Sequence, residues 1–421
     1  MKALLISANT ERINLVPLPL GMSYVAAATR SAGHDVRVLD LMTEGDTEAR
    51  IREAAVSFAP GVIGISVRNI DDQIRDGRFL LDGVRKVVRS CRSLSDAPIV
   101  LGGAGYSIFP EHVLAYLEAD MGIRGEGEVA FPILLDRLAR KADLSETPGL
   151  YIRGRGLQGV RRFAEALDSL PVSAAHEFLA PPSPDLLLPF QTRRGCPLDC
   201  SYCSTATIEG RMIRRRSPEA AVAELARCVA AGFRRIHFVD NTFNLPLGYA
   251  KELCRRIIAR RLEFSWQCII YPGRIDEQLA KLMADAGCKE VSVGFESGCA
   301  RILRAMNKRF SIEEIRQTVE LFARYGIRQM GFLLLGGPGE TRESVLESLT
   351  FADSLPLDQL KVSMGVRIYP DTALARQALS EGMILPDDDL LHPKFYLAER
   401  LEEWLPEIVK AWMADRPHWM T

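Results

Sequence analysis

Residues 192–204 read TRRGCPLDCSYCS, and this short stretch places Cys196, Cys200 and Cys203 at the spacing C-x3-C-x2-C. Thiolates are soft ligands for iron, so three of them on one loop can hold three irons of a [4Fe–4S] cube. The fourth iron is then left open, which is unusual for an electron-transfer cluster and suits a cluster that binds a substrate directly. The spacing therefore predicts a catalytic iron–sulfur site at these cysteines.

A zinc site is the main alternative for three closely spaced cysteines. Structural zinc takes four Cys or His ligands, but the next candidates, Cys228 and His237, fall inside a predicted helix and a predicted strand. The chain has nine cysteines, and an odd number in a long intracellular chain argues against a disulfide framework. An iron–sulfur cluster is therefore favoured over zinc and over disulfides.

A series of strands and helices is predicted around the cysteine loop, from residue 189 to residue 375. Six strand–helix units form an incomplete (β/α)6 barrel of the TIM type, with the cysteines at the end where barrel enzymes keep their chemistry. The expected strands are 190–193, 235–239, 264–270, 290–294, 329–335 and 361–368, and the expected helices include 218–231, 249–260, 276–286 and 312–325.

The first 143 residues also alternate strand and helix. Their strands are mostly apolar on both faces, as in the parallel sheet of a doubly wound, Rossmann-like domain. Ligands of such sheets bind at the carboxyl ends of the strands, where this chain carries Gly, Ser and Asn. The expected strands are 2–7, 35–41, 62–66, 98–102 and 121–124, and the expected helices are 21–32, 48–58 and 76–91.

Two further segments complete the predicted α/β organisation. Residues 144–188 hold a Gly-rich stretch typical of a hairpin and a Pro-rich stretch without helical period, so we expect a linker with a hairpin. Residues 376–421 are expected to form a C-terminal helical extension, with an amphipathic segment near 401–414.

The cysteine spacing, the aromatic Tyr202 before the third cysteine and the predicted barrel together resemble the radical S-adenosylmethionine (SAM) superfamily. The resemblance implies that the open iron takes the amino and carboxylate groups of SAM, and that one electron cleaves SAM to methionine and a 5′-deoxyadenosyl radical. It assigns Cys196, Cys200 and Cys203 as catalytic cluster ligands. By position at the strand ends, it implies SAM contacts at Tyr202, Asp240, Asn241, Thr242, Glu296, Ser297, Gly336 and Gly337.

A doubly wound domain placed before such a barrel resembles the cobalamin-binding class of radical SAM enzymes. The stretch VLGGAGYSIFPE at 100–111 is similar to the GG…PE loop that packs along the nucleotide tail of cobalamin, and RGEGEVAF at 124–131 is similar to the GEGE segment that follows. The resemblance, which covers roughly residues 1–375, implies cobalamin contacts at Ser7, Asn9, Met42, Ser66, Arg68, Gly102, Gly103, Gly105, Gly125, Glu126 and Gly127.

One departure concerns the axial ligand of cobalt. Many cobalamin domains carry D-x-H-x-x-G, whose His binds cobalt, but residues 40–45 have Met42 in that place. Methionine thioether is a weak donor that more often packs, so we expect cobalamin without a His axial ligand. Arg68 is the candidate to face cobalt, because a cation there favours the reduced metal on charge grounds. The alternatives are a surface salt bridge of Arg68 with Asp71 or Asp72, and a domain that no longer binds cobalamin.

The resemblance implies a cobalamin-dependent radical SAM methyltransferase, in which methylcobalamin donates a methyl group to a substrate radical at an unactivated carbon. A cobalamin-dependent cyclase or rearrangement enzyme without methyl transfer is the first alternative, and a non-catalytic cluster and corrinoid sensor is the second. A small-molecule substrate and a reductant of the ferredoxin or flavodoxin type are the expected partners.

Charge and hydropathy exclude several other classes. Lys and Arg number 53 and Asp and Glu number 54, so the net charge of −1 gives no general attraction to nucleic acid or to anionic lipid. No secretory signal and no membrane span is predicted, so we expect a cytoplasmic protein. The basic run RMIRRRS at 211–217 is interpreted as a solvated face, or as a surface that steers an anionic substrate or an acidic electron donor.

Overall fold

The structure is a computed structural model that describes residues 1–11, 18–42, 45–171 and 186–421. It divides into two compact units, each described here by itself. Unit 1 comprises Met1–Asp72, Gly77–Pro182 and Ser204–Arg215, and unit 2 comprises Gln73–Asp76, Ser183–Cys203 and Arg216–Thr421. In the described part of the chain, no helix is both long and apolar enough to cross a membrane.

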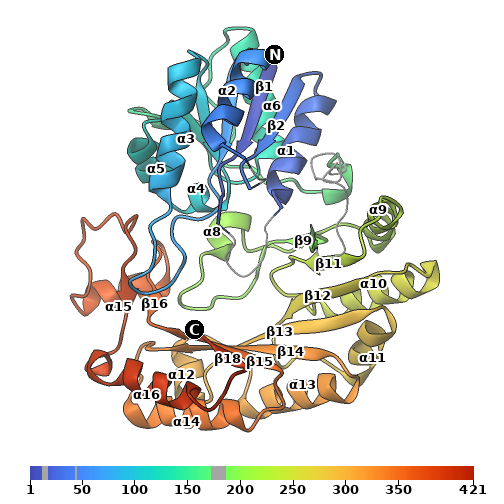
Figure 1. Ribbon diagram of the computed structural model, residues 1–421, viewed down its shortest axis with the longest axis vertical. Helices are drawn as coiled ribbons and strands as arrows, with labels where there is room; N and C mark the ends of the chain where they lie inside the picture. The colour runs from blue at the N-terminus through green and yellow to red at the C-terminus, as the bar shows by residue number, and fades with distance from the viewer. Residues whose placement is uncertain (12–17, 43–44, 172–185) are drawn as a thin grey trace. The chain divides into compact units, whose positions relative to one another are not determined.

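Unit 1 is built on a seven-stranded sheet in the order β2-β1-β3-β4-β5-β6-β7 (Figure 1). The first five strands pair in parallel and the last two are antiparallel. The strands are β1 (Lys2–Ser7), β2 (Asp35–Asp40), β3 (Val62–Ser66), β4 (Ile99–Gly102), β5 (Met121–Ile123), β6 (Leu150–Ile152) and β7 (Gly156–Leu157). The helices are α1 (Leu20–Ser31), α2 (Thr47–Phe58), α3 (Leu81–Leu94), α4 (Ala104–Ile108), α5 (Pro110–Leu117), α6 (Gly127–Ala139) and, after the cysteine loop, α8 (Thr205–Glu209).

The predicted doubly wound sheet is confirmed, because helices cover both faces of these parallel strands. Helices α1 and α6 pack together on one face, and α2 packs against α3 on the other. A core cluster on the first face joins Leu5 of β1 and Ala26 of α1 to Phe131 and Leu134 of α6. Burial of such side chains is the main favourable contribution to folding.

Two parts of unit 1 differ from the expectation. The hairpin assigned to the linker continues the main sheet, since Leu150 pairs with Ile123 at the free edge of β5. The Pro-rich part of the linker, residues 172–185, lies outside the described residues. Helix α3 begins at Leu81 rather than at 76, because residues 70–80 fold back on themselves through hydrogen bonds from Leu80 N to Ile70 O (2.8 Å) and from Asp72 N to Arg78 O (3.2 Å).

Unit 2 contains an open parallel sheet in the order β18-β15-β14-β13-β12-β11-β8. Figure 1 shows α9, α10, α11, α13 and α14 following one another along one side of this curved sheet. The strands are β8 (Leu188–Phe190), β11 (Arg235–Phe238), β12 (Ser265–Ile270), β13 (Cys288–Glu296), β14 (Arg328–Leu335), β15 (Gln359–Met364) and β18 (Trp419–Met420). The helices are α9 (Pro218–Ala230), α10 (Leu247–Arg260), α11 (Glu277–Asp285), α12 (Ala300–Ala305), α13 (Ile312–Arg324), α14 (Arg342–Asp353), α15 (Ala373–Ser380) and α16 (Leu405–Met413).

The six predicted barrel strands are present, with two local differences. The first divides into β8 and the short β9 (Arg193–Arg194), and the sixth divides at Gly365 into β15 and β16 (Val366–Arg367). The C-terminal extension does more than add helices, because β18 pairs in parallel with β15 and becomes the seventh strand of the sheet. β8 and β18 occupy opposite edges of the sheet, as an incomplete barrel requires.

Candidate active site

The three cysteines lie on the loop that follows β9. Cys196 is buried, Cys200 is half-buried and Cys203 is exposed, and none of the three is in a disulfide. Among the described residues, no three Cys, His, Asp or Glu side chains are gathered closely enough to hold a single metal ion. Each thiolate of a [4Fe–4S] cube binds a different iron, so cluster ligands need a wider spacing than the ligands of one ion. The donor set and its partial exposure fit such a cluster.

A buried ion pair holds the start of this loop. Asp240, which follows β11, accepts hydrogen bonds from the backbone N–H groups of Thr192 (2.7 Å) and Arg193 (2.9 Å). Its second oxygen accepts from Thr192 Oγ1 (2.5 Å) and from Arg193 Nη2 (3.0 Å). Both side chains of the Arg193–Asp240 pair are almost fully buried. The pair therefore fixes β9 against the end of β11, three residues before the first cysteine.

Arg193 is a residue that sequence reasoning did not single out. Its guanidinium also donates to the carbonyls of Phe243 (2.7 Å) and Leu245 (2.8 Å), so the buried charge is well compensated. Asp240 was predicted to contact SAM, but its two oxygens already have partners within the protein. SAM contacts at Asp240 and at the half-buried Asn241 and Thr242 stay predictions.

Three polar side chains meet beside the cysteine loop, at the end of β13. Glu296 Oε1 accepts from the hydroxyl of Tyr202 at 3.0 Å and from the ammonium of Lys308 at 3.1 Å. The Lys308 nitrogen also lies 5.3 Å from the centre of the Tyr202 ring. Lys308 and Glu296 are 5% and 13% exposed, so the pair is largely shielded from water. Lys308 was missed in the sequence because it sits in a loop without a motif.

The electrostatics of this cluster follow from its burial. Burial lowers the pKa of Lys308. The nearby Glu296, Tyr202 and Cys200 have a larger effect in the opposite direction, so the pKa of Lys308 is well above its usual value. Burial raises the pKa of Tyr202 strongly, and Glu296 adds to that rise. Burial also raises the pKa of the Cys200 thiol, while Lys308 opposes the rise. Lys308 is therefore a cation held next to a cysteine whose ligand form is the anion.

The backbone at Glu296 is in an uncommon conformation. Its φ is +63°, in the left-handed region that non-glycine residues rarely adopt, and the register between β13 and β14 shifts between Gly294 and Glu296. Such strain persists where the surroundings over-determine it, often at functional sites. The irregular strand end turns the Glu296 carboxylate toward Tyr202 and Lys308.

The other predicted SAM contacts in unit 2 have structural partners of their own. Ser297 is fully buried, with its hydroxyl 2.9 Å from that of Ser348. The backbone N–H groups of Gly336 and Gly337, after β14, both donate to the buried carboxylate of Glu340. Burial raises the pKa of Glu340 to about 7, against the effect of those two donors. The contribution of Ser297 and the two glycines to SAM binding stays a prediction.

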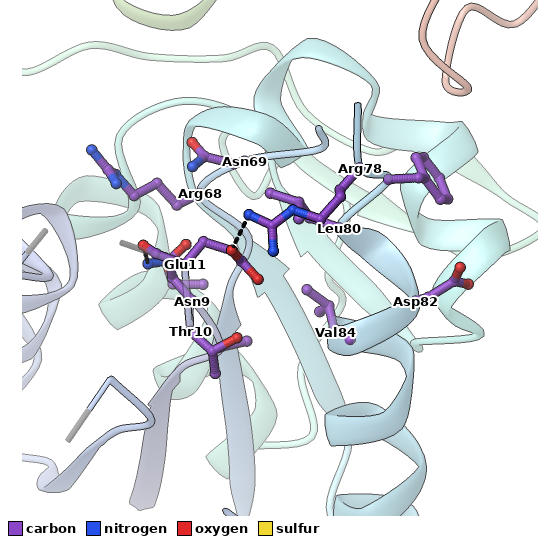
Figure 2. A pocket seen from close by; sticks show the side chains of 13 residues that line it. Asn9, Thr10, Glu11, Arg68, Asn69, Arg78, Leu80, Asp82 and Val84 are labelled. Carbon is purple, nitrogen blue, oxygen red and sulfur yellow. Dashed lines mark hydrogen bonds and ion pairs between the residues drawn. The ribbon is translucent and has the colours of Figure 1, made fainter. Parts of the chain in front are cut away.

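Unit 1 has a pocket at the carboxyl ends of β1 and β3 (Figure 2). It encloses about 370 Å³, and none of the described residues that line it is a histidine. The predicted residues Asn9, Ser66 and Arg68 are among its lining. Figure 2 shows Arg68 extending away from the ion pair between Arg78 and Glu11. In that pair, Arg78 Nη2 and Glu11 Oε2 are 2.6 Å apart. Concave sites with a few polar groups at such strand ends are where doubly wound sheets bind ligands.

The glycines at the end of β4 and just after it differ in the space around them. Gly103 has φ +101°, and a Cβ there would lie 2.5 Å from the carbonyl oxygen of Val67; a Cβ at Gly105 would lie 3.0 Å from that of Arg68. These two glycines let the β4 loop rest on the backbone of the β3 loop that carries Arg68. Gly102 differs, since a Cβ there would meet nothing within 4 Å. Gly102 is not among the residues that line the β1–β3 pocket, so its contact with cobalamin stays a prediction.

The GEGE segment is used inside the protein. Glu126 accepts from Ala164 N at 2.7 Å and pairs with Arg214 at 2.6 Å, with both charged side chains buried. A Cβ at Gly125 would lie 2.7 Å from Arg161, and one at Gly127 would lie 2.9 Å from Val25. These contacts explain the three residues by close packing in unit 1, so their contact with cobalamin stays a prediction.

Ser7 is the last residue of β1, and Met42 follows the end of the neighbouring strand β2. The backbone N–H of Met42 donates to Asp40 (3.2 Å), and Ser7 hydrogen-bonds the same carboxylate, whose pKa is raised by burial despite these donors. Neither residue lines the pocket at β1 and β3. Thr43 and Glu44, within the stretch compared with D-x-H-x-x-G, lie outside the described residues.

Comparison with known families matches both halves of the chain. The radical SAM superfamily model matches residues 191–352, and the B12 binding domain model matches residues 6–135. The chain belongs to the radical SAM enzymes that carry a B12-binding domain. The cysteine loop and the Glu296 cluster therefore lie in its radical SAM domain, and the β1–β3 pocket lies in its B12-binding domain.

Two relatives and one solved structure show the extent of the similarity. An uncharacterised methyltransferase of Pyrococcus horikoshii is 28% identical, over 91% of this chain and 84% of its own length. The tryptophan 2-C-methyltransferase of Streptomyces laurentii is 26% identical, over 87% of this chain and 73% of its own. The radical SAM methyltransferase TsrM of Kitasatospora setae, solved with tryptophan and a SAM analogue, has a TM-score of 0.81 at 25% identity, over 90% of this chain and 76% of its own.

Proposed function

We propose that this protein is a cobalamin-dependent radical SAM enzyme that methylates a carbon atom of a small molecule. The observation that carries the proposal is the cysteine loop with the Glu296–Lys308–Tyr202 cluster beside it, in a chain that also has a B12-binding domain. When bound, the [4Fe–4S] cluster, SAM and cobalamin supply the radical chemistry and the transferable methyl group. The chain supplies ligands, charges and a shielded space for them.

Cys196, Cys200 and Cys203 would hold the cluster, with the buried Arg193–Asp240 pair keeping their loop in place. Lys308 and Glu296 would hold the charged methionine end of SAM, because an ammonium and a carboxylate complement its carboxylate and amino groups. The mostly apolar surroundings strengthen these attractions relative to water.

The pocket of the B12-binding domain would hold the corrin ring with Arg68 toward cobalt and without a histidine ligand. We expect Arg68→Ala to shift the midpoint potential of bound cobalamin to a more negative value, since loss of a nearby cation makes each reduced state less favourable. Spectroelectrochemical titration of the cobalamin-loaded protein measures this shift, and Arg68→Lys is the matched control. Identical potentials for all three proteins would place Arg68 away from cobalt.

Gly102 and Gly103 give a paired test of whether the loop at the end of β4 contacts the corrinoid. Gly103→Ala forces a Cβ against Val67 O at a positive φ. We therefore expect the free energy of unfolding to fall by about 1–3 kcal/mol even without corrinoid. Gly102→Ala meets open space, so stability should be unchanged while corrinoid affinity falls. Thermal unfolding and equilibrium binding of hydroxocobalamin separate the two. Unchanged affinity in Gly102→Ala would remove this residue from the site.

Two relatives support a small-molecule substrate. TsrM was solved with tryptophan, and the Streptomyces laurentii protein is a tryptophan methyltransferase. The test is anaerobic reconstitution with iron, sulfide, SAM and hydroxocobalamin, followed by mass spectrometry of products from tryptophan and a pool of small molecules. A product heavier by one methyl group supports the proposal. A product of unchanged mass would support a cyclase or rearrangement enzyme instead.

A further inference from the structure

The structure assigns a docking surface for a small acidic electron-carrier protein to Val160, Arg162, Arg211 and Met212 of unit 1. This inference rests on the proposed function, because only a redox cluster needs such a carrier. The carrier would lose one electron and the cluster would gain it, with no other change of bonds. The four residues are called the carrier surface below.

Exposure is the first observation. Among the large apolar side chains in the described part of the chain, Val160 and Met212 are the two most exposed, at 82% and 76%. Arg162, two positions after Val160, and Arg211, directly before Met212, are exposed as well. Apolar side chains left in water beside arginines are typical of protein interfaces, where Met and Arg are enriched.

A half-buried frame holds the two segments of the carrier surface together. Phe163 lies between two guanidinium groups, 4.4 Å from that of Arg161 and 4.6 Å from that of Arg214. Arg161 also donates to the carbonyl of Thr207, and Arg214 forms the buried pair with Glu126. The exposed side chains therefore project from a rigid base. Exposed apolar groups on a rigid base are better suited to a partner than a mobile loop is.

Charge selects the class of partner. Residues 150–163 and 210–215 hold five exposed arginines, Arg153, Arg155, Arg162, Arg211 and Arg215, and no acidic residue, although the whole chain has a net charge of −1. A surface of this sign attracts an acidic protein and speeds its association. Single-stranded nucleic acid fits less well, because it needs exposed aromatic side chains for stacking. Here Tyr151 is buried and Phe163 is held between arginines. Arg211 lies eight positions after Cys203 in the chain, which suits a donor to the cluster.

The test compares reduction of the reconstituted cluster by a protein carrier and by dithionite. The carriers are a flavodoxin with its NADPH-dependent reductase and a [4Fe–4S] ferredoxin. We expect Arg162→Glu with Arg211→Glu to slow carrier-driven reduction by about tenfold or more and to remove the decrease of its rate with added salt. Dithionite-driven reduction should be unchanged. Val160→Ser with Met212→Ser should slow the carrier reaction without changing its salt dependence.

Two control proteins keep the result interpretable. Arg162→Lys with Arg211→Lys keeps the charge and should keep the rate, and Arg89→Glu with Val56→Ser makes matched changes on exposed positions of α3 and α2. Equal rates in wild type and charge-reversed protein, or failure of both carriers to reduce the wild type, would overturn the carrier surface. So would loss of single-stranded RNA binding in the charge-reversed protein with carrier reduction intact. Failure of dithionite to reduce any cluster would instead remove the proposed function, and the carrier surface with it.

Discussion

Replacement of Cys200 by alanine should abolish SAM cleavage while the chain still folds. Each of the three cysteines would bind a different iron, so removing one leaves a cube that the remaining two cannot hold. Loss of a group that merely supports a metal ligand costs 10–100-fold, so we expect loss of a ligand to lower 5′-deoxyadenosine formation by about 100-fold or more. The measurement is 5′-deoxyadenosine per chain after anaerobic reconstitution with dithionite and SAM.

Cys228→Ala is the matched control, because Cys228 is also a free cysteine but lies in α9. It should keep its iron and its SAM cleavage. Equal product from the Cys200→Ala and wild-type proteins would show that the loop is not the cluster site. Equal loss in both variants would point to damage of the fold.

Replacement of Asp240 by alanine should be the most destabilising change in the radical SAM domain. The substitution leaves the guanidinium of Arg193 buried without its carboxylate, and breaking a buried pair in this way costs about 3–5 kcal/mol. It also removes the acceptors for the backbone N–H groups of Thr192 and Arg193, which begin the cysteine loop. We expect a lower thermal unfolding temperature and less iron retained per chain.

Asp276→Ala provides a scale for this effect. Asp276 caps α11 through a hydrogen bond to Leu279 N (2.9 Å) and is about half exposed, so its loss should cost about 1 kcal/mol. A loss for Asp240→Ala no larger than this would contradict the role given to the buried pair. Unfolding of the metal-free proteins, followed by circular dichroism, makes the comparison.

Much of the fold follows from local patterns in the sequence. The strands at 2–7 and 62–66 were predicted to the residue, because short runs apolar on both faces belong to buried parallel strands. The start of α3 was placed five residues early, since the backbone hydrogen bonds that turn residues 70–80 back on themselves leave no mark in the hydrophobic pattern. The two-residue strand β18 was missed because so short a strand has no period to read.

In the candidate site, too, residues that belong to a motif could be identified from the sequence, and residues that depend on tertiary contacts could not. The cysteine spacing pointed to the cluster loop, and Glu296 was found from its place at a strand end. Lys308 and Arg193 were missed, because their importance comes from partners 12 and 47 positions away in the chain. Glu126 shows the opposite case, in which a motif was clear but its side chain is used to hold Ala164 and Arg214.

The proposed function requires that Cys196, Cys200 and Cys203 hold a [4Fe–4S] cluster whose fourth iron binds SAM. The most direct measurement is the electron paramagnetic resonance spectrum of the reduced cluster in the reconstituted protein, recorded with and without saturating SAM. We expect a [4Fe–4S] signal whose g-values shift when SAM is added, because SAM becomes a ligand of one iron. A signal unchanged by SAM would contradict it.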